Sequence, residues 1–158
     1  MCRLFTSIKA GIFAVYSIRW LMNIEERKSL SETRIFKPVF ASDTNHYNTL
    51  HGGVAMHMMD DTAFIAATRF TKLPVVTVSS DRINFNKPIP TGTIVEIVAK
   101  VIELGVTSVK VGVDVYIEQM YTESRELAIH GVLTFVALDS NKRPVSIVKH
   151  LEKLGVSL

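Results

Sequence analysis

The alternation of apolar and polar residues predicts four long β-strands after residue 74. Between Val109 and Ile117 every second residue is valine or isoleucine, which is the period of a strand that buries one face. Strands are expected at Val75–Phe85, Thr93–Leu104, Thr107–Glu118 and Glu126–Leu138. The connections between them are shorter than the dozen or so residues that a parallel crossover needs, so successive strands should pair antiparallel.

Before these strands, the sequence predicts one strand, a polar loop and one helix. Thr33–Phe40 is typical of a strand, and Ala41–His51 is a loop rich in polar residues. Val54–Phe70 contains no glycine or proline and is apolar on most sides of a helix, so a sheet should wrap around it. The predicted fold is therefore α+β, with a curved antiparallel sheet wrapped around one central helix, as in the hotdog architecture. A β-sandwich would leave the helix unexplained.

The length of 158 residues suits a single domain. We expect an N-terminal extension at 1–30, whose status the sequence leaves open, a hotdog domain at 31–148 and a C-terminal tail at 149–158. Residues 10–22 are mostly apolar but too few to span a bilayer, and no signal-peptide cleavage site follows. One hypothesis is that the native chain begins at Met22. A packed N-terminal helix and a membrane-surface anchor are the alternatives.

The composition limits the cellular compartments and the binding partners that suit this chain. The single cysteine, Cys2, rules out an internal disulfide and fits a reducing compartment such as the cytoplasm. Lysine and arginine number 18 against 15 acidic residues, an excess too mild for a dedicated nucleic-acid binder. A solvated basic surface explains this excess, which would also suit a ligand carrying phosphates. No nucleic-acid partner and no membrane span are expected.

Asp60 lies on a largely apolar stripe of the predicted helix. At 100° per residue it shares one side with Gly53 and Phe64. A buried carboxylate is costly unless it is paired or hydrogen-bonded, so Asp60 is either catalytic or a structural carboxylate that bonds neighbouring backbone. Asp61 instead clusters with His57 and Thr68 on a polar arc, where exposure to solvent or a hydrogen bond explains it.

The start of the helix offers a second feature. Free N–H groups and the glycines Gly52 and Gly53 would let an oxyanion approach the backbone. Asp60 lies about 10 Å further along the axis, so a complete site would use residues from two chains. Asn45 and His51 in the preceding loop could bind a carbonyl oxygen or orient a water, or could simply cap the helix.

Together these residues resemble a known signature. Asn45–Gly53, followed by Met58–Asp60, is similar to the signature of the hotdog acyl-CoA thioesterases, namely the YciA-like and brain-type cytosolic acyl-CoA hydrolases. The likeness continues through Val76–Asp81, Gly105–Ser108 and Phe135–Asp139. Each of these segments alone is weak evidence for the family. The ordered set is specific, and it covers nearly the whole predicted domain.

The resemblance implies roles for several residues. Asp60 matches the catalytic aspartate, and Asn45 matches an asparagine that completes the site from the neighbouring subunit. Asn48 stands where glycine is usual, and asparagine is the most tolerable replacement if φ is positive there. The family forms dimers that pair their sheets edge to edge, often assembled into hexamers. The coenzyme A site is implied at two strand segments, which are Val78, Ser79 and Ser80, and Thr107, Ser108 and Val109.

We therefore expect an acyl-CoA thioesterase, a thioester hydrolase. Asp60 would take a proton from the water that attacks the thioester carbonyl, while His51, Gly52 and Gly53 bind the substrate and its oxyanion. A covalent route through an anhydride on Asp60 stays open. No metal-ligand spacing is present, and no cofactor is expected because coenzyme A is part of the substrate.

Two alternatives remain at this point. A hotdog enoyl-thioester hydratase or dehydratase would use a histidine with a carboxylate, which His51 or His57 near Asp60 could imitate. A non-catalytic acyl-CoA-binding protein would have no need of a carboxylate at Asp60. The acyl-chain preference, the physiological substrate and any nucleotide regulation are not specified by the sequence.

Overall fold

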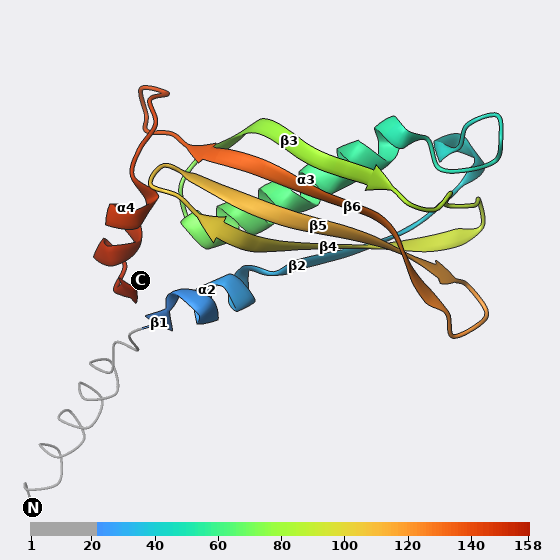
Figure 1. The fold of residues 1–158 in the computed structure, drawn as a ribbon, viewed down its shortest axis with the longest axis horizontal. Coiled ribbons are helices and arrows are strands. Elements are labelled where there is room, and N and C mark those ends of the chain that lie inside the picture. The colour runs from blue at the N-terminus through green and yellow to red at the C-terminus, as the bar shows by residue number, and fades with distance from the viewer. Residues whose placement is uncertain (1–21) are drawn as a thin grey trace, which may run out of the picture.

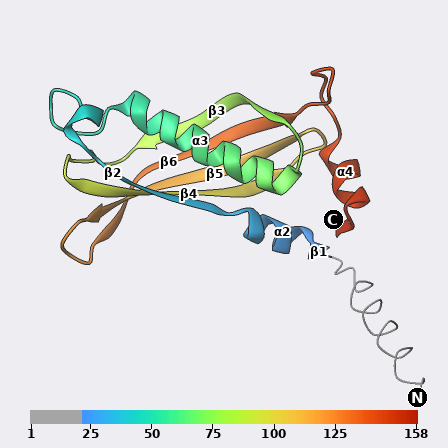
Figure 2. The ribbon, with the colours of Figure 1, turned by 180° about the vertical axis from the view of Figure 1, so that it is seen from behind.

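A five-stranded antiparallel sheet dominates the computed structural model, which describes residues 22–158 (Figure 1). Its spatial order is β2-β4-β5-β6-β3. The strands are β2 (Thr33–Pro38), β3 (Val75–Phe85), β4 (Thr93–Leu104), β5 (Ser108–Gln119) and β6 (Arg125–Ala137). The sheet curves around the long helix α3 (Gly52–Thr71), as the view from behind shows (Figure 2). The predicted α+β hotdog fold is confirmed. The hypothesis about a start at Met22 concerns residues 1–21, which lie outside the described residues.

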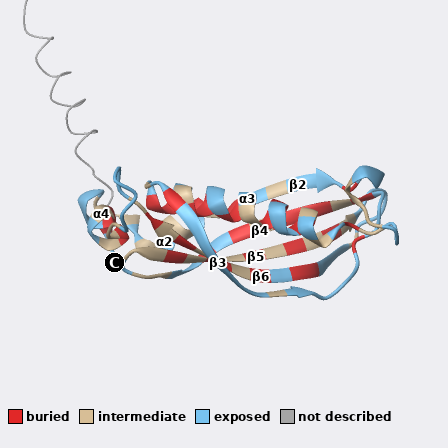
Figure 3. Cartoon of the chain, turned by 90° about the horizontal axis from the view of Figure 1, so that it is seen from above, coloured by how far each residue is buried: buried red, intermediate tan, exposed pale blue. Residues whose placement is uncertain are grey.

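The core forms where α3 meets the concave face of the sheet (Figure 3). Val109, Val111 and Val113 on β5 are fully buried, and the intervening residues of that strand are not. Burying such a side chain stabilises the fold by about 1.5–3 kcal/mol. Ala63 and Ala66 on α3 are also fully buried, and their small side chains let the helix lie close to the sheet.

The two ends of α3 have distinct caps. His51 caps the N-terminus, and its Nδ1 accepts a hydrogen bond from the Gly53 N–H at 3.1 Å. The helix therefore begins two residues before the predicted Val54. At the other end Lys72 adopts the left-handed region with φ 56° and donates its N–H to Thr68 O at 2.9 Å. Helix propagation stops there, shortly before Pro74.

One face of α3 is open in a single chain, although the sequence predicts a helix covered on most sides. Met56, Phe64 and Ile65 are 43%, 45% and 38% exposed. The reason is geometric, because a five-stranded sheet covers only one side of the helix. Apolar residues on the opposite side therefore need a ligand or another subunit to cover them.

The remaining elements gather near the C-terminal end of α3 (Figure 1). They are β1 (Met22–Asn23), α2 (Ile24–Ser31), α4 (Ile147–Lys153) and β7 (Val156–Ser157), with a short 3₁₀ turn η1 (Ala41–Asp43) at the opposite end. β1 pairs in parallel with β7. The expected boundary between residues 148 and 149 falls within α4. Within the described part of the chain, no helix has the length and apolar character needed to cross a membrane.

Two arginines join α2 to α3 reciprocally. Arg27 on α2 donates from Nε to Phe70 O at 2.6 Å, near the end of α3. Arg69 on α3 donates to Leu30 O at 2.6 Å and to Glu32 O at 2.7 Å, at the end of α2. Burial lowers the pKa of the Arg27 guanidinium. Each helix end thus receives positive charge where its carbonyls lack intrahelical donors.

The convex face of the sheet carries a buried carboxylate. Glu96 on β4 is 1% exposed and accepts from Arg34 Nη1 and Arg125 Nε, each at 2.5 Å. The Arg125 guanidinium also lies 3.4 Å from the ring centre of Tyr116. Hydrogen bonds to Glu32 and Glu96 raise the pKa of Arg34, and the hydrogen bond to Glu96 raises the pKa of Arg125. Glu96 therefore links the edge strand β2 to the start of β6.

Candidate active site

Asp60 lies on the third turn of α3, where its side chain contacts the edge strand β3. Its Oδ1 accepts a hydrogen bond of 2.8 Å from the Thr77 hydroxyl. The Asp60 side chain is partly buried rather than enclosed, because one face of α3 is open. β3 follows the helix closely from its start, since a Cβ added at Gly52 would lie 3.7 Å from the Phe85 ring. The carboxylate therefore lies between α3 and β3.

The start of α3 presents backbone donors, but not all of them are free. The Gly53 N–H is already bonded to His51 Nδ1. The N–H groups of Gly52 and Val54 have no acceptor within residues 22–158. A bound oxyanion could accept hydrogen bonds from these two N–H groups without any rearrangement. It could accept one from the Gly53 N–H only if the His51 ring turns away. Because Nδ1 is the acceptor, neutral His51 carries its proton on Nε2.

Asn45 is held in a tight turn. Its Oδ1 accepts from Tyr47 N at 2.9 Å, Thr49 Oγ1 at 3.1 Å and Thr49 N at 3.3 Å. With the oxygen occupied, its Nδ2 amide has no acceptor in the part of the chain that the structure describes, and it can donate to a carbonyl or water oxygen. Asn48 closes the turn with φ 58°, the left-handed conformation expected where the family has glycine.

Within one chain, Asn45 and Asp60 do not meet. Asn45 precedes the start of α3, and Asp60 lies about 12 Å along the axis from Gly52 at 1.5 Å per residue. The loop that holds Asn45 lies at one end of the sheet, beyond the start of α3 (Figure 1). A site that uses both side chains on one substrate needs a second subunit.

The two segments expected to bind coenzyme A lie near one another, on strands separated only by β6. The register aligns Thr77 with Phe135 and Val109, and aligns Val76 with Val136 and Ser108. The segment from Val78 to Ser80 is exposed, and Thr107 and Ser108 are partly exposed. Val109 is fully buried and faces the core, so no part of it is open to a ligand in a single chain.

β3 is irregular beside Asp60. Its register against β6 shifts between Thr77 and Ser79, and again between Asp81 and Asn84. Arg82 adopts φ 52° within the second irregularity. Ile83 faces α3 as Thr77 does, since a Cβ added at Gly131 would meet both Ile83 and Met59.

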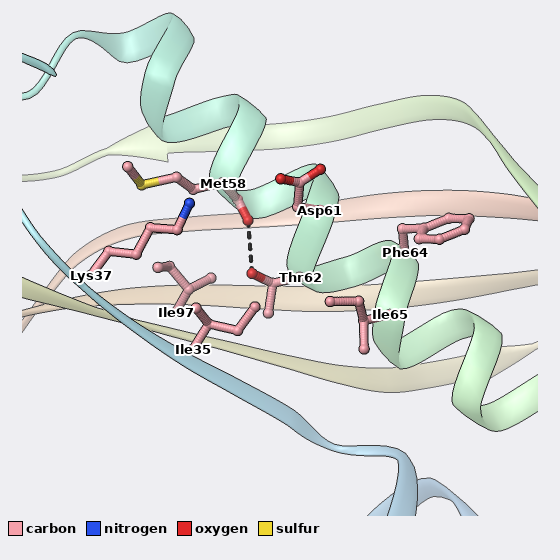
Figure 4. Close-up of a pocket in the computed structure, with 8 residues that line it drawn as sticks. All are labelled: Ile35, Lys37, Met58, Asp61, Thr62, Phe64, Ile65 and Ile97. Atoms are coloured by element: carbon pink, nitrogen blue, oxygen red, sulfur yellow. Dashed lines mark hydrogen bonds between the residues drawn. The ribbon is translucent and has the colours of Figure 1, made fainter.

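Two hollows flank the open face of α3 and share Phe64. One lies between α3 and β2 and has a volume of about 230 Å³. Ile35, Met58, Ile65 and Ile97 form its apolar wall, and the Lys37 side chain reaches across it toward α3 (Figure 4). The other, of about 480 Å³, lies between the end of α3 and the start of β3.

The histidine and carboxylate needed by the hydratase alternative do not come together at Asp60. The His57 Nε2 atom lies 3.6 Å from Asp61 Oδ2, and both side chains are more than half exposed. Neither His51 nor His57 contacts Asp60 in residues 22–158. The polar arc expected around Asp61 is confirmed, and this geometry favours the hydrolase over the hydratase.

Thr77 is the site residue that the sequence reasoning missed. It lies within the Val76–Asp81 segment that carries the resemblance, but only its neighbours were assigned roles. The signal was available in the alternation of β3, because Val75 is a core residue and Thr77 lies two positions later on the same face. A hydroxyl facing a helix at the level of an acidic residue indicates a hydrogen bond.

Comparison with known proteins places these features in a family. The family model described as the thioesterase superfamily matches residues 47–124. An uncharacterised acyl-CoA thioester hydrolase of Bacillus subtilis is 41% identical over 128 residues, which are 80% of this chain and 74% of that protein.

Solved structures of similar proteins point to the same family. The acyl-CoA hydrolase of Staphylococcus aureus, in complex with butyryl coenzyme A, coenzyme A and coenzyme A disulfide, is 39% identical with a TM-score of 0.73, covering 75% of this chain and 73% of that one. A hexameric acyl-CoA thioesterase is 31% identical with the same TM-score, covering 75% and 76%.

Variants of the Staphylococcus aureus enzyme replace an asparagine, an aspartate and a threonine by alanine. The asparagine precedes the aspartate by 15 residues and the threonine follows it by 17. The same spacings separate Asn45, Asp60 and Thr77 in this chain.

Proposed function

The chain belongs to the acyl-CoA thioester hydrolases of the thioesterase superfamily, and from this membership we propose that Asp60, Asn45 and the start of α3 form its active site. The protein hydrolyses acyl-CoA to a free fatty acid and coenzyme A. The observation that carries the proposed site is the hydrogen bond of 2.8 Å between Thr77 and Asp60. It holds a carboxylate between α3 and β3, at the sequence spacing from Asn45 and Thr77 described above.

Asp60 acts as the general base in the proposed reaction. Its carboxylate takes a proton from water while the water oxygen bonds to the thioester carbonyl carbon. The carbonyl oxygen becomes an oxyanion, which N–H groups at the start of a second subunit's α3 stabilise, because those of the same chain lie about 12 Å from Asp60 along the helix. When the oxyanion collapses, the carbon–sulfur bond breaks, and the proton passes from Asp60 to the departing thiolate. No metal or cofactor is needed. Asp60 attacking the carbonyl itself, to give an anhydride, is the alternative route.

Asn45 comes from a second subunit in this proposal. Its free Nδ2 amide can only donate, so it binds the thioester carbonyl or the oxygen of the attacking water. The exposed edge of β3 supplies the means of assembly, because its unpaired backbone groups can join the β3 edge of another copy. A dimer, assembled further as a trimer of dimers, is supported by the hexameric relative. The resemblance to cytosolic hydrolases and the lone cysteine favour the cytoplasm.

Steady-state release of coenzyme A from acyl-CoAs of several chain lengths tests this function. We expect turnover by the wild-type protein, and a loss of at least about a hundredfold in kcat for Asp60→Asn, the typical contribution of a general base. The control is an unchanged oligomer and circular dichroism spectrum. If coenzyme A binds but no acyl-CoA is hydrolysed, and Asp60→Asn binds as well as wild type, the non-catalytic binding protein replaces the enzyme.

A further inference from the structure

A small apolar hollow lies beside the start of α3. It has a volume of about 250 Å³ and is bounded by α3, β6 and the connection between β3 and β4, which lies at the same end of the sheet as the start of α3 (Figure 1). Among the described residues that line it, only Lys87 has a polar side chain. The apolar wall consists of Leu50, Ala55, Phe85, Ile89 and Ile129. Such a wall suits an apolar ligand.

This hollow, called here the inner hollow, adjoins the oxyanion donors. Ala55 lies in the first turn of α3, and a Cβ added at Gly52 would lie 3.7 Å from the Phe85 ring that forms part of the wall. The N–H groups of Gly52 and Val54 are the donors without an acceptor in residues 22–158. The carbonyl carbon of a thioester bears both the oxygen and the acyl chain. When the start of α3 binds the oxygen, the acyl chain therefore begins next to the inner hollow.

An ion pair neutralises the charge of Lys87. Its Nζ donates to Glu126 Oε2 at 2.6 Å, and Glu126 does not line the inner hollow. The hydrogen bond from Lys87 lowers the pKa of the Glu126 carboxyl, so the pair is ionised at neutral pH. The lysine therefore presents mainly its methylene stem to the inner hollow. An anionic ligand would compete with Glu126 for the ammonium group, which favours an uncharged chain as the occupant.

A second hollow of about 240 Å³ lies on the other side of Lys87 and Pro88. It is called here the outer hollow, and Glu126 is part of its lining. Lys87 and Pro88 line both hollows, so these two residues form the partition between them. The ion pair holds this partition in place, because it joins the connection after β3 to the start of β6.

The volume of the inner hollow sets the length of chain that it can hold. An apolar cavity of about 150 Å³ binds benzene, which has six carbons. On this scale a volume of about 250 Å³ holds an acyl chain of on the order of ten carbons. The end of a longer chain must either remain in solvent or displace the partition and enter the outer hollow.

We propose that the inner hollow binds the acyl chain of the substrate, and that the Lys87–Glu126 ion pair limits the chain to about ten carbons. This inference rests on the proposed function. Because the oxyanion donors belong to a second subunit, the chain lies in the hollow of that subunit and not in the subunit whose Asp60 activates the water. Lys87 is thereby a specificity-determining residue that takes no part in the chemistry.

Chain-length profiles test the limit at Lys87. The kcat/KM is measured for butyryl-CoA, decanoyl-CoA and palmitoyl-CoA, each below its micellar concentration. For wild type we expect kcat/KM to rise up to decanoyl-CoA, because each buried methylene strengthens binding about fourfold, and to fall for palmitoyl-CoA. In Lys87→Ala the partition opens, and the value for palmitoyl-CoA should rise about tenfold, as if one or two more methylenes were buried. The value for butyryl-CoA should stay the same.

Two variants control this measurement. Lys87→Arg keeps the ion pair and should keep the wild-type profile. Lys110→Ala breaks another ion pair, with Glu103, whose side chains are about as exposed as those of Lys87 and Glu126, and it should also leave the profile unchanged. If Lys87→Ala changes kcat/KM equally for all chain lengths, or not at all, the ion pair does not limit the chain.

Ala55→Val tests the inner hollow itself, because it adds two methyl groups to the wall beside the oxyanion donors. We expect the KM of decanoyl-CoA to rise about tenfold, the gain from one or two buried methylenes being lost. The KM of acetyl-CoA, which has almost no chain, should stay nearly constant. The melting temperature should not fall, since the added methyl groups enter an empty space. An equal rise of KM for both substrates, or none for either, would overturn the assignment of the hollow.

Calorimetry separates this inference from the proposed function. Binding of coenzyme A and of decanoyl-CoA is compared in Asp60→Asn, which does not need to turn over substrate, and in Asp60→Asn/Ala55→Val. Tighter binding of decanoyl-CoA that is lost in the double variant supports the hollow even if wild type hydrolyses nothing. If Ala55 has no influence on the binding of decanoyl-CoA while wild type is active, the hollow is not the acyl site and the function stands.

Discussion

The Thr77 hydroxyl donates to the Asp60 carboxylate at 2.8 Å, and this contact connects the middle of α3 to the edge strand of the sheet. It occupies Oδ1, whereas Oδ2 has no partner in residues 22–158. One oxygen is thus held by the fold and the other is open to water. The orientation of the base therefore depends on a strand whose outer edge is exposed in a single chain.

Removing the Thr77 hydroxyl should lower kcat while leaving substrate binding largely intact. We expect Thr77→Val to lose about tenfold to a hundredfold in kcat, because misplacing a base by an ångström has effects of this size. Thr77→Ser keeps the donor and should retain most activity. Equal activity of Thr77→Val and wild type would mean that Asp60 needs no such positioning.

Two inactive variants should restore activity to each other if the site is shared. In a mixed dimer of Asp60→Asn and Asn45→Ala, one of the two sites combines an intact Asp60 with an intact Asn45. Random mixing then recovers about a quarter of wild-type activity, since half the dimers are mixed and each has one working site. The measurement is coenzyme A release after the subunits are unfolded and refolded together. No recovery, from variants that each form oligomers, would place both side chains in one chain's site.

Truncating Glu96 should destabilise the fold without altering the contacts of Asp60. Glu96→Ala leaves Arg34 and Arg125 facing each other without their shared carboxylate. Removing one partner of a buried pair costs about 3–5 kcal/mol. Because both arginines are nearly half exposed, we expect a smaller loss of about 2 kcal/mol in the free energy of unfolding. Urea denaturation measures it, with Lys110→Ala, which breaks an exposed pair, as the control.

A methyl group at Gly131 should disturb the bulge of β3. A Cβ there would lie 2.9 Å from Ile83 Cγ1 and 3.1 Å from Met59 Cε, so the bulge or the helix must move. We expect Gly131→Ala to cost about 1–3 kcal/mol, as overpacking does, and to lower kcat because Met59 adjoins Asp60. Gly112→Ala is the matched control, since its neighbour Ile102 is 50% exposed and can yield. Similar losses for both would argue against a tight contact at Gly131.

Strong periodicity made the sheet predictable from the sequence. β3 and β4 have the predicted bounds, and β5 and β6 differ from theirs by one residue at each end. The segment Ile24–Ser31 was not predicted as a helix because its eight residues carry no apolar stripe. It forms because Asn23 caps its start and Arg69 bonds its last carbonyls, and the second of these is a tertiary contact that no local pattern reveals.

The site was predictable in part. Asp60 was indicated because helix geometry sets its side of α3 from the sequence alone. The sequence does not reveal that the Gly53 N–H donates to the His51 ring, or that the Asn45 side-chain oxygen accepts from its own turn. Both hydrogen bonds depend on side-chain orientation, which residue types do not fix. Thr68 was counted with a polar arc, and only the surrounding contacts reveal that its buried hydroxyl makes no hydrogen bond within residues 22–158.

The two register shifts of β3 also limit aggregation. An exposed edge strand with Val76 and Val78 on it is a template on which further chains can stack. Here the regular ladder is broken after Thr77 and again after Asp81, so the strand has no long flat stretch. Such an edge suits one twisted partner strand better than an endless row of copies. The irregularities of β3 beside Asp60 thereby favour a closed assembly over a fibre.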